Sequence, residues 1–232
     1  MTPFDYRQFY RRNLPHIHSP GSTLFTTFRL ADSIPASVVS KYRNERILRE
    51  REAKADRELA EFYREWFLKF DAILDKAAAG PIWLARPEVR SVVYEKLLKD
   101  DVSKYRLDAF SIMSNHVHVV FRPNLDERSL TETRIAGRVG FKSDQDTLAE
   151  IMQSIKGVTA RDCNRLLNRR GQFWEHESFD REVRNEEGFI RAVRYTLRNP
   201  VKAGLVKRPM DWPGNFLASR LLDDPRFVDL LE

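Results

Sequence analysis

The sequence has a single cysteine, Cys163, in 232 residues. This scarcity excludes a disulfide framework and a metal site built from several thiolates. The chain also lacks an apolar run long enough to span a membrane, and its opening "MTPFDYRQFYRRNLPH" lacks the apolar core of a signal peptide. We therefore expect a protein of the cytoplasm with no membrane partner.

Hydrophobic residues make up 42% of the chain, enough to bury a substantial core in one domain over residues 1–232. Lysine and arginine exceed aspartate and glutamate by 40 to 34, which gives a net charge of +6. This excess is compatible with a polyanionic partner but does not identify one.

The stretch "SIMSNHVHVVFRP" places His116 and His118 one valine apart in a run typical of a strand. Successive side chains of a strand point to opposite faces, so the two imidazoles share one face. Either they are satisfied polar residues at a sheet end, or they are exposed on a half-solvated face, or they share a divalent metal ion. A second pair, His16 and His18, lies between prolines that favour turns, so its side chains need not share a face. We favour the first pair.

The first half of the chain predicts a strand over 22–30 and then a charged helical insertion over about 38–80. An apolar stripe in this insertion is typical of packing, at Leu59, Phe62, Tyr63, Trp66, Phe67, Phe70 and Leu74. Another helix follows Pro87. Two strands, 105–114 and 116–123, then meet at Ser114 and Asn115, a polar pair suited to a tight turn.

The second half predicts a polar loop over 124–145, a helix over 148–166, a strand over 171–183, a helix starting at Asn185 and a tail over about 205–232. Basic side chains on the first of these helices are candidate DNA contacts, or simply solvated charges: Lys156, Arg161 and Arg165. The order of elements predicts an α+β fold. It matches a ferredoxin-like βαββαβ antiparallel sheet with an added C-terminal helix.

On that last helix Tyr195 precedes Asn199 by four residues, so both side chains lie on one face. Pro200 is expected to put Asn199 near the helix end. Tyr195 could be an ordinary half-buried aromatic residue and Asn199 a plain C-terminal cap. Together, a phenol and an amide could also serve one site.

In these motifs the chain resembles the single-tyrosine HUH transposases of bacterial insertion sequences, and within them the REP-associated tyrosine transposases. The histidine motif stands in "MSNHVHVVF" and the nucleophile segment in "YTLRNPVKAGLV", with Tyr195 in the catalytic position. The segments "LPHIHSPGSTLFTTFRLADSIP", "IMQSIKGVTA" and "FWEHESFDREVRNEE" also look like parts of that subgroup. Several motifs in the right order are more specific than any one of them.

The resemblance implies that His116 and His118 hold Mg²⁺ or Mn²⁺ and that Tyr195 attacks a phosphate of single-stranded or hairpin DNA. A 5′-phosphotyrosine would form, and strands could then be rejoined. A polar residue one turn beyond the tyrosine completes the metal site in related enzymes. Asn199 has that position here, although an amide is a weaker ligand than a carboxylate.

Two other functions stay open on the sequence. One is a domesticated, non-catalytic protein that binds DNA hairpins, although the intact His116, His118 and Tyr195 speak against it. The other is a metal-dependent phosphohydrolase that uses water, with a structural Tyr195. The resemblance also leaves open a monomer or a homodimer, since related transposases exchange the tyrosine helix between subunits.

Overall fold

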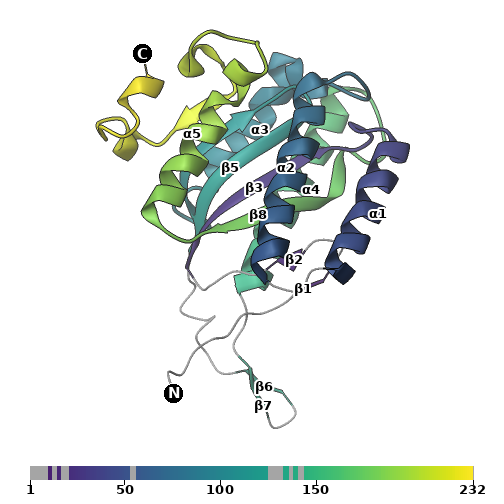
Figure 1. The fold of residues 1–232 in the computed structure, drawn as a ribbon. Coiled ribbons are helices and arrows are strands. Elements are labelled where there is room, and N and C mark those ends of the chain that lie inside the picture. The colour runs from purple at the N-terminus through teal and green to yellow at the C-terminus, as the bar shows by residue number, and fades with distance from the viewer. Residues whose placement is uncertain are drawn as a thin grey trace.

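The computed structural model describes residues 10–11, 15–16, 21–52, 56–124, 133–135, 138–140 and 144–231. Its centre is a five-stranded antiparallel sheet in the order β8-β3-β5-β4-β9 (Figure 1). The strands are β3 (Thr23–Leu30), β4 (Tyr105–Ile112), β5 (His116–Pro123), β8 (Trp174–Val183) and β9 (Asn215–Leu217). The helices are α1 (Ala36–Glu52), α2 (Asp56–Lys76), α3 (Pro87–Lys99), α4 (Asp144–Leu166) and α5 (Glu186–Lys202).

The strands β8, β3, β5 and β4 are the fourth, first, third and second strands of a βαββαβ pattern, so the predicted α+β, ferredoxin-like sheet is confirmed. The predicted turn is also present: Met113 N donates to His116 O at 2.9 Å, and Ser114 and Asn115 join β4 to β5. The strand β9, which was not predicted, pairs with β4 and extends the sheet.

One face of the sheet packs against α3 and α4 through apolar side chains. Because strand side chains alternate, every second residue of β5 contributes to this core. The core includes Val117, Val119 and Phe121 of β5, Val93 and Leu97 of α3, and Ile155 of α4, all fully buried.

The opposite face lies under α2 and α5, with α1 beside α2 (Figure 1). A second apolar cluster packs there, with Phe25, Phe67, Val120, Val193 and Leu197 among its members. The helical insertion consists of α1 and α2, which contact each other through Tyr42 of α1 and Trp66 and Phe70 of α2. This face therefore combines the insertion with the C-terminal helix.

Two boundaries differ from the expectation. The expected polar loop contains two short antiparallel strands, β6 (Thr133–Ile135) and β7 (Arg138–Gly140), and α4 already begins at Asp144. Residues 125–132, 136–137 and 141–143 lie outside the described residues. Very short strands carry too little apolar alternation to be predicted from sequence.

The start of α5 is as predicted, because the Asn185 side chain caps it by accepting from Gly188 N at 2.8 Å. The helix continues through Pro200 to Lys202, so Asn199 lies near its end, as expected. Pro200 has no N–H to donate, but the last turn of α5 does not need it, because Ala203 N donates to Asn199 O at 2.9 Å. Asn199 is consequently not the C-terminal cap.

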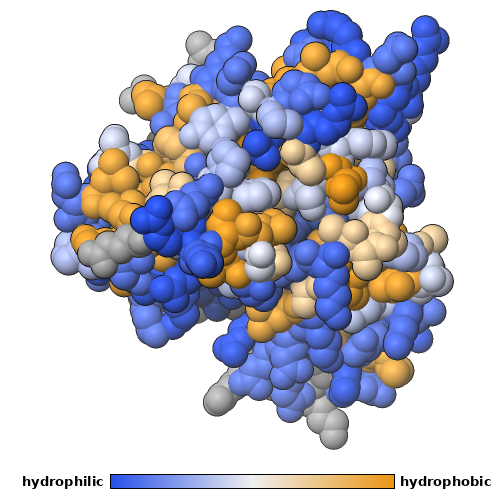
Figure 2. All heavy atoms as spheres, turned by 90° about the horizontal axis from the view of Figure 1, so that it is seen from above, coloured by the Kyte–Doolittle hydropathy of each residue, from blue (hydrophilic) through white to orange (hydrophobic). Residues whose placement is uncertain are grey.

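The remaining elements are short. Strands β1 (Tyr10–Arg11) and β2 (Pro15–His16) pair with each other. Single turns of 3-10 helix lie at Trp83–Ala85, Pro209–Asp211, Ser219–Leu221 and Val228–Leu230. Seen from above, hydrophobic patches on the surface alternate with hydrophilic side chains (Figure 2). No helix among the described residues is long and apolar enough to cross a membrane.

Candidate active site

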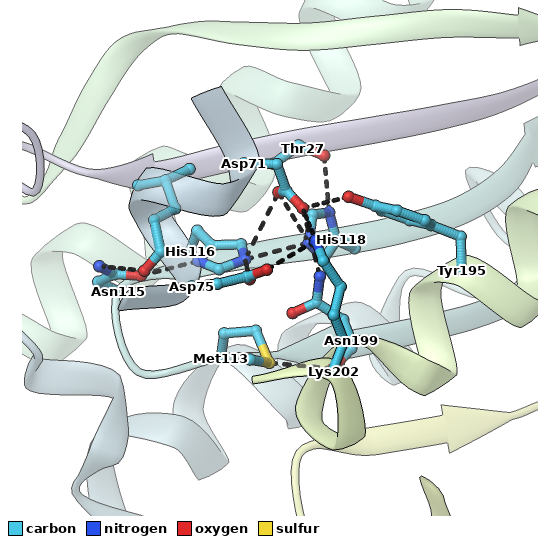
Figure 3. Close-up of polar contacts among 12 residues, drawn as sticks. Thr27, Asp71, Asp75, Met113, Asn115, His116, His118, Tyr195, Asn199 and Lys202 are labelled. Atoms are coloured by element: carbon cyan, nitrogen blue, oxygen red, sulfur yellow. Dashed lines mark hydrogen bonds and ion pairs between the residues drawn. The ribbon is translucent and has the colours of Figure 1, made fainter. Parts of the chain in front are cut away.

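The two histidines of β5 lie buried side by side under α2 and α5 (Figure 3). His116 opens the strand and His118 follows two residues later, so both rings point to the same face, as predicted. Their Nε2 atoms are 3.0 Å apart, and neither residue is exposed to solvent. The pair therefore presents two ring nitrogens to one point.

The other nitrogen of each ring has a fixed partner. Asn115 Oδ1 lies 2.7 Å from His116 Nδ1, and Asn115 Nδ2 donates to Leu74 O at 3.1 Å, which orients the amide. His116 must then donate from Nδ1 and keep a lone pair on Nε2. The Thr27 hydroxyl, 2.7 Å from His118 Nδ1, can accept in the same way. Such partners orient metal-binding histidines.

Burial also sets the charge of the pair. Desolvation lowers the pKa of both His116 and His118 to about 3, and for His116 the neighbouring His118 lowers it further. Both rings are thus neutral at pH 7, which is the form that binds a metal ion.

A carboxylate that was not predicted completes the cluster. Asp71 of α2 is fully buried, and its Oδ1 lies 3.3 Å from His118 Nε2 and 3.9 Å from His116 Nε2. This oxygen has no hydrogen-bond partner among the described residues. One ligand atom from each of the three residues lies within 4.8 Å of the others.

The donor atoms of this cluster fit a divalent cation. Two neutral ring nitrogens with inward lone pairs and an unpaired carboxylate oxygen would repel one another if nothing lay between them. A divalent ion relieves that repulsion and satisfies the buried Asp71 Oδ1. His116, His118 and Asp71 are therefore the residues that could hold it.

Asp71 was missed because the apolar stripe of the insertion was interpreted as packing alone. Phe67, Asp71 and Leu74 are spaced four and three residues apart on α2, so the aspartate lies within that stripe. A carboxylate at an apolar position of an amphipathic helix is costly unless it has a partner. An aspartate within an apolar stripe was therefore the signal in the sequence that could have identified Asp71 as a site residue.

Tyr195 of α5 reaches the same carboxylate from the other side. Its hydroxyl donates to Asp71 Oδ2, and its ring centroid lies 5.7 Å from that of His118 (Figure 3). Phe25 and Phe67 contact the ring edge-on or tilted, at 5.8 and 5.9 Å. Burial, and then the negative charge of Asp71, raise the pKa of Tyr195 well above its usual value, so the phenol holds its proton at pH 7.

Asn199 lies one turn further along α5, as its spacing predicted. Its Nδ2 donates to Asp71 Oδ2 at 3.4 Å, while its buried Oδ1 has no hydrogen-bond partner among the described residues. That free oxygen can serve as a further ligand, so the structure brings both α5 residues to the histidine pair.

Two charged residues at the edge of the cluster were also missed. Lys202 Nζ lies 2.8 Å from Asp75 Oδ2 and 3.5 Å from Asp71 Oδ2. Burial, and then the neighbouring Asp71, raise the pKa of Asp75 to about 6. Asp75 Oδ1 is 3.8 Å from His116 Nε2. Lys202 therefore places a positive charge beside two carboxylates.

The predicted basic DNA contacts are not brought to this cluster, because α4 covers the opposite face of the sheet (Figure 1). Lys156 Nζ donates to the carbonyl oxygens of Glu175, His176 and Glu177. Arg161 and Arg165 are exposed and pair with Asp162. Of the rival pair, His18 lies outside the described residues, and only the backbone of His16 is described.

Comparisons with known proteins add little to this geometry. No protein-family model matches the chain, and no curated protein matches it. Among solved structures, one similar chain is described as a REP-associated tyrosine transposase bound to a REP hairpin. It shares 15% identity with a TM-score of 0.42, over 90% of this chain and 81% of the other. Likeness at this level does not bear on function, which rests on the residues above.

Proposed function

We propose that this chain is a metal-dependent endonuclease and strand transferase that cuts and rejoins single-stranded or hairpin DNA through Tyr195. One observation carries the proposal: the buried Asp71 contacts the tyrosine hydroxyl with Oδ2 and faces the histidine pair with Oδ1. A nucleophile and a metal-binding cluster thus share one carboxylate. This arrangement supports a transposase-like reaction of the single-tyrosine HUH type.

The cation, Mg²⁺ or Mn²⁺, would be held by His116, His118 and Asp71, with Asn199 as a weaker fourth ligand. When bound, such an ion polarises a phosphate and stabilises the charge that develops on it. The surrounding residues fix the ligands: Thr27 and Asn115 hold the two imidazoles in the required orientation.

Protein residues supply the nucleophile and the proton acceptor. Tyr195 Oη forms a bond to the phosphorus, and Asp71 Oδ2, which already accepts its hydrogen bond, takes the proton. The bond from phosphorus to the 3′ oxygen breaks, which leaves a 5′-phosphotyrosine, and the 3′ oxygen takes a proton from solvent water to become a hydroxyl. Because one phosphodiester replaces another, that hydroxyl can attack the phosphotyrosine and rejoin the strand without an external energy source.

A water-using phosphohydrolase is the second candidate. It is favoured by the raised pKa of Tyr195, since a phenol that keeps its proton and only donates to Asp71 could be a structural residue. In that case Tyr195→Phe would remove one positioning hydrogen bond, worth about 1 kcal/mol. Nicking would then persist at about a fifth of the wild-type rate.

A covalent-adduct assay separates the two. Purified protein, Mn²⁺ and hairpin oligonucleotides labelled at the 5′ or the 3′ end are resolved on a denaturing gel. We expect protein attached to the 3′-labelled fragment in wild type and no nicking by Tyr195→Phe. Tyr94→Phe is the matched control, because Tyr94 lies on α3 and packs against Phe110 away from the site. Robust nicking by Tyr195→Phe would establish the hydrolase instead.

A further inference from the structure

A cavity of about 850 Å³ opens beside the active site, between the insertion helices α1 and α2 and the strands β3 and β8. Its volume is typical of sites that hold a small organic group, roughly 300–1,000 Å³. Thr27 and Asp71 line both this cavity and the histidine cluster. A molecule in the cavity would therefore lie next to the reacting phosphate.

The cavity presents flat surfaces on which a base can stack. Trp66 and Phe70 of α2 stack on each other with ring centroids 5.0 Å apart, and Phe70 is partly exposed. The planar guanidinium of Arg29 lies 5.7 Å from the Phe70 ring centroid. Unpaired bases stack on aromatic rings and on arginine planes of this kind.

Positive charge is available at the opening. Arg43 on α1 is exposed, lines the cavity and forms no ion pair with any described residue. By contrast, Arg29 donates to Glu175 at 3.0 Å, and Arg46 lies 3.4 Å from Glu50. Arg43 is consequently the residue suited to a phosphate group of a nucleic-acid strand.

The wall also contains an acceptor without a donor. Glu177 Oε1 on β8 is buried and has no hydrogen-bond partner among the described residues. A buried carboxylate oxygen in this state is costly, and the amino group of a nucleobase is the type of donor that carboxylates accept from. Stacking rings, a phosphate contact and a base-edge acceptor thus lie around one cavity.

We infer that this cavity binds one unpaired nucleotide of the DNA strand next to the cut, with its base against Phe70 and Glu177 and its phosphate near Arg43. The inference rests on the proposed function, because it assigns a subsite of the same substrate. It gives the insertion a role in holding the strand, beyond the contribution of Asp71.

The test is a binding measurement with a chelator present, so that no strand is cut. Fluorescence anisotropy gives the Kd for hairpins with single-stranded flanks, each lacking one base of the flank. We expect one position near the cut at which base removal weakens binding about tenfold. Phe70→Ala should weaken binding of the intact hairpin by a similar factor and have no further effect on the hairpin that lacks that base.

Two less disruptive substitutions keep the test informative if Phe70→Ala misfolds. Arg43→Ala should weaken binding and lower the salt dependence of the Kd by the equivalent of about one phosphate contact. Arg49 is another exposed arginine of α1 but lies outside the cavity, so Arg49→Ala should change neither. Glu177→Gln should change which base is preferred at the critical position. Equal losses at every flank position, or no loss with any of these variants, would overturn the subsite.

The outcomes also separate this inference from the proposed function. If wild type forms the covalent adduct but the cavity variants bind every hairpin as wild type does, the cavity serves another occupant and only the subsite falls. If wild type binds no unpaired or hairpin DNA, the subsite and the proposed function fall together.

Discussion

The two faces of strand β5 are buried to the same extent but differ in chemistry. Val117 and Val119 on one face and His116 and His118 on the other are all fully shielded from water. The valines need only matching shape from α3 and α4. The histidines need a partner for each polar atom, because an unpaired buried polar group is costly. Burial alone therefore does not distinguish the two faces of β5; the polar atoms of the histidine face do.

The polar face retains that unmet polarity around the histidines. Asp71, Asp75 and Asn199 each keep at least one buried oxygen without a hydrogen-bond partner among the described residues. Native structures leave few such atoms, and a bound ion is one explanation for a cluster of them. The packing face stabilises the fold, whereas the polar face contains buried oxygen atoms that a metal ion could satisfy.

The largest effect on stability should appear when Phe28 and Thr27 are compared, because these adjacent residues of β3 point to opposite faces of the sheet. Phe28→Ala on the packing face should lower the free energy of unfolding by about 3–5 kcal/mol, because its fully packed ring leaves a cavity. Thr27→Val on the polar face should cost only about 1 kcal/mol but weaken Mn²⁺ binding roughly 10–100-fold. Urea unfolding and metal titration measure the two effects. If Phe28→Ala and Thr27→Val changed the Mn²⁺ affinity equally, the two faces would not differ in their role in metal binding.

A smaller effect should distinguish two buried carboxylates. Mn²⁺ at 100 times its Kd should stabilise wild type by about 2.7 kcal/mol, and Asp71→Asn should lose this gain. Without metal, Asp71→Asn should be at least as stable as wild type, since its amide can donate to His118 Nε2, now 3.3 Å from Asp71 Oδ1. Asp108→Asn is the control, because Asp108 already pairs with Arg220.

Thermal unfolding with and without Mn²⁺ gives these values. Asp108→Asn should be less stable than wild type but keep the full Mn²⁺ effect. If Asp71→Asn were stabilised by Mn²⁺ as much as wild type is, the carboxylate would not be a ligand.

The smallest effect, counted per histidine and per pH unit, is a pH dependence that only the polar face should produce. The pKa of each site histidine is 6.5 in the unfolded chain and about 3 in the folded protein. Below pH 6.5 the unfolded chain therefore binds protons that the fold excludes, and the free energy of unfolding falls by at most about 1.4 kcal/mol per pH unit and histidine. Asp75, with its pKa raised from 3.8 to about 6, offsets part of this between those values.

Urea unfolding between pH 7 and pH 4, in metal-free buffer, measures the slope. A double variant, His116→Gln with His118→Gln, should flatten it. Val117→Ala should lower stability equally at every pH. A slope that survives the double histidine variant would place its origin elsewhere.

Much of the fold could be predicted because its strands and helices carry strong local patterns. The alternation in "HVHVVF" placed the two histidines on one face, and the four-residue spacing of Tyr195 and Asn199 placed them on one turn of α5. These patterns depend only on the geometry of single elements.

What escaped prediction depends on how distant segments pack. Asp71 lies in an apolar stripe, and only the approach of α2 to β5 shows that it faces the histidines. Strand β9 has three residues and pairs with β4 across about a hundred positions, so no local pattern marks it. The cavity likewise exists only between α1, α2 and the sheet.

The contact between Asp71 and Tyr195 joins residues 124 positions apart in the chain. At 5–20 residues per second, synthesis of that interval takes on the order of ten seconds. Throughout it, a growing chain already contains Asp71 and then both histidines, but not yet Tyr195. Under the proposed function, such a chain would contain the metal ligands but not the nucleophile that attaches to DNA. On the proposed function, the order of residues would therefore postpone covalent attachment until Tyr195 has been synthesised.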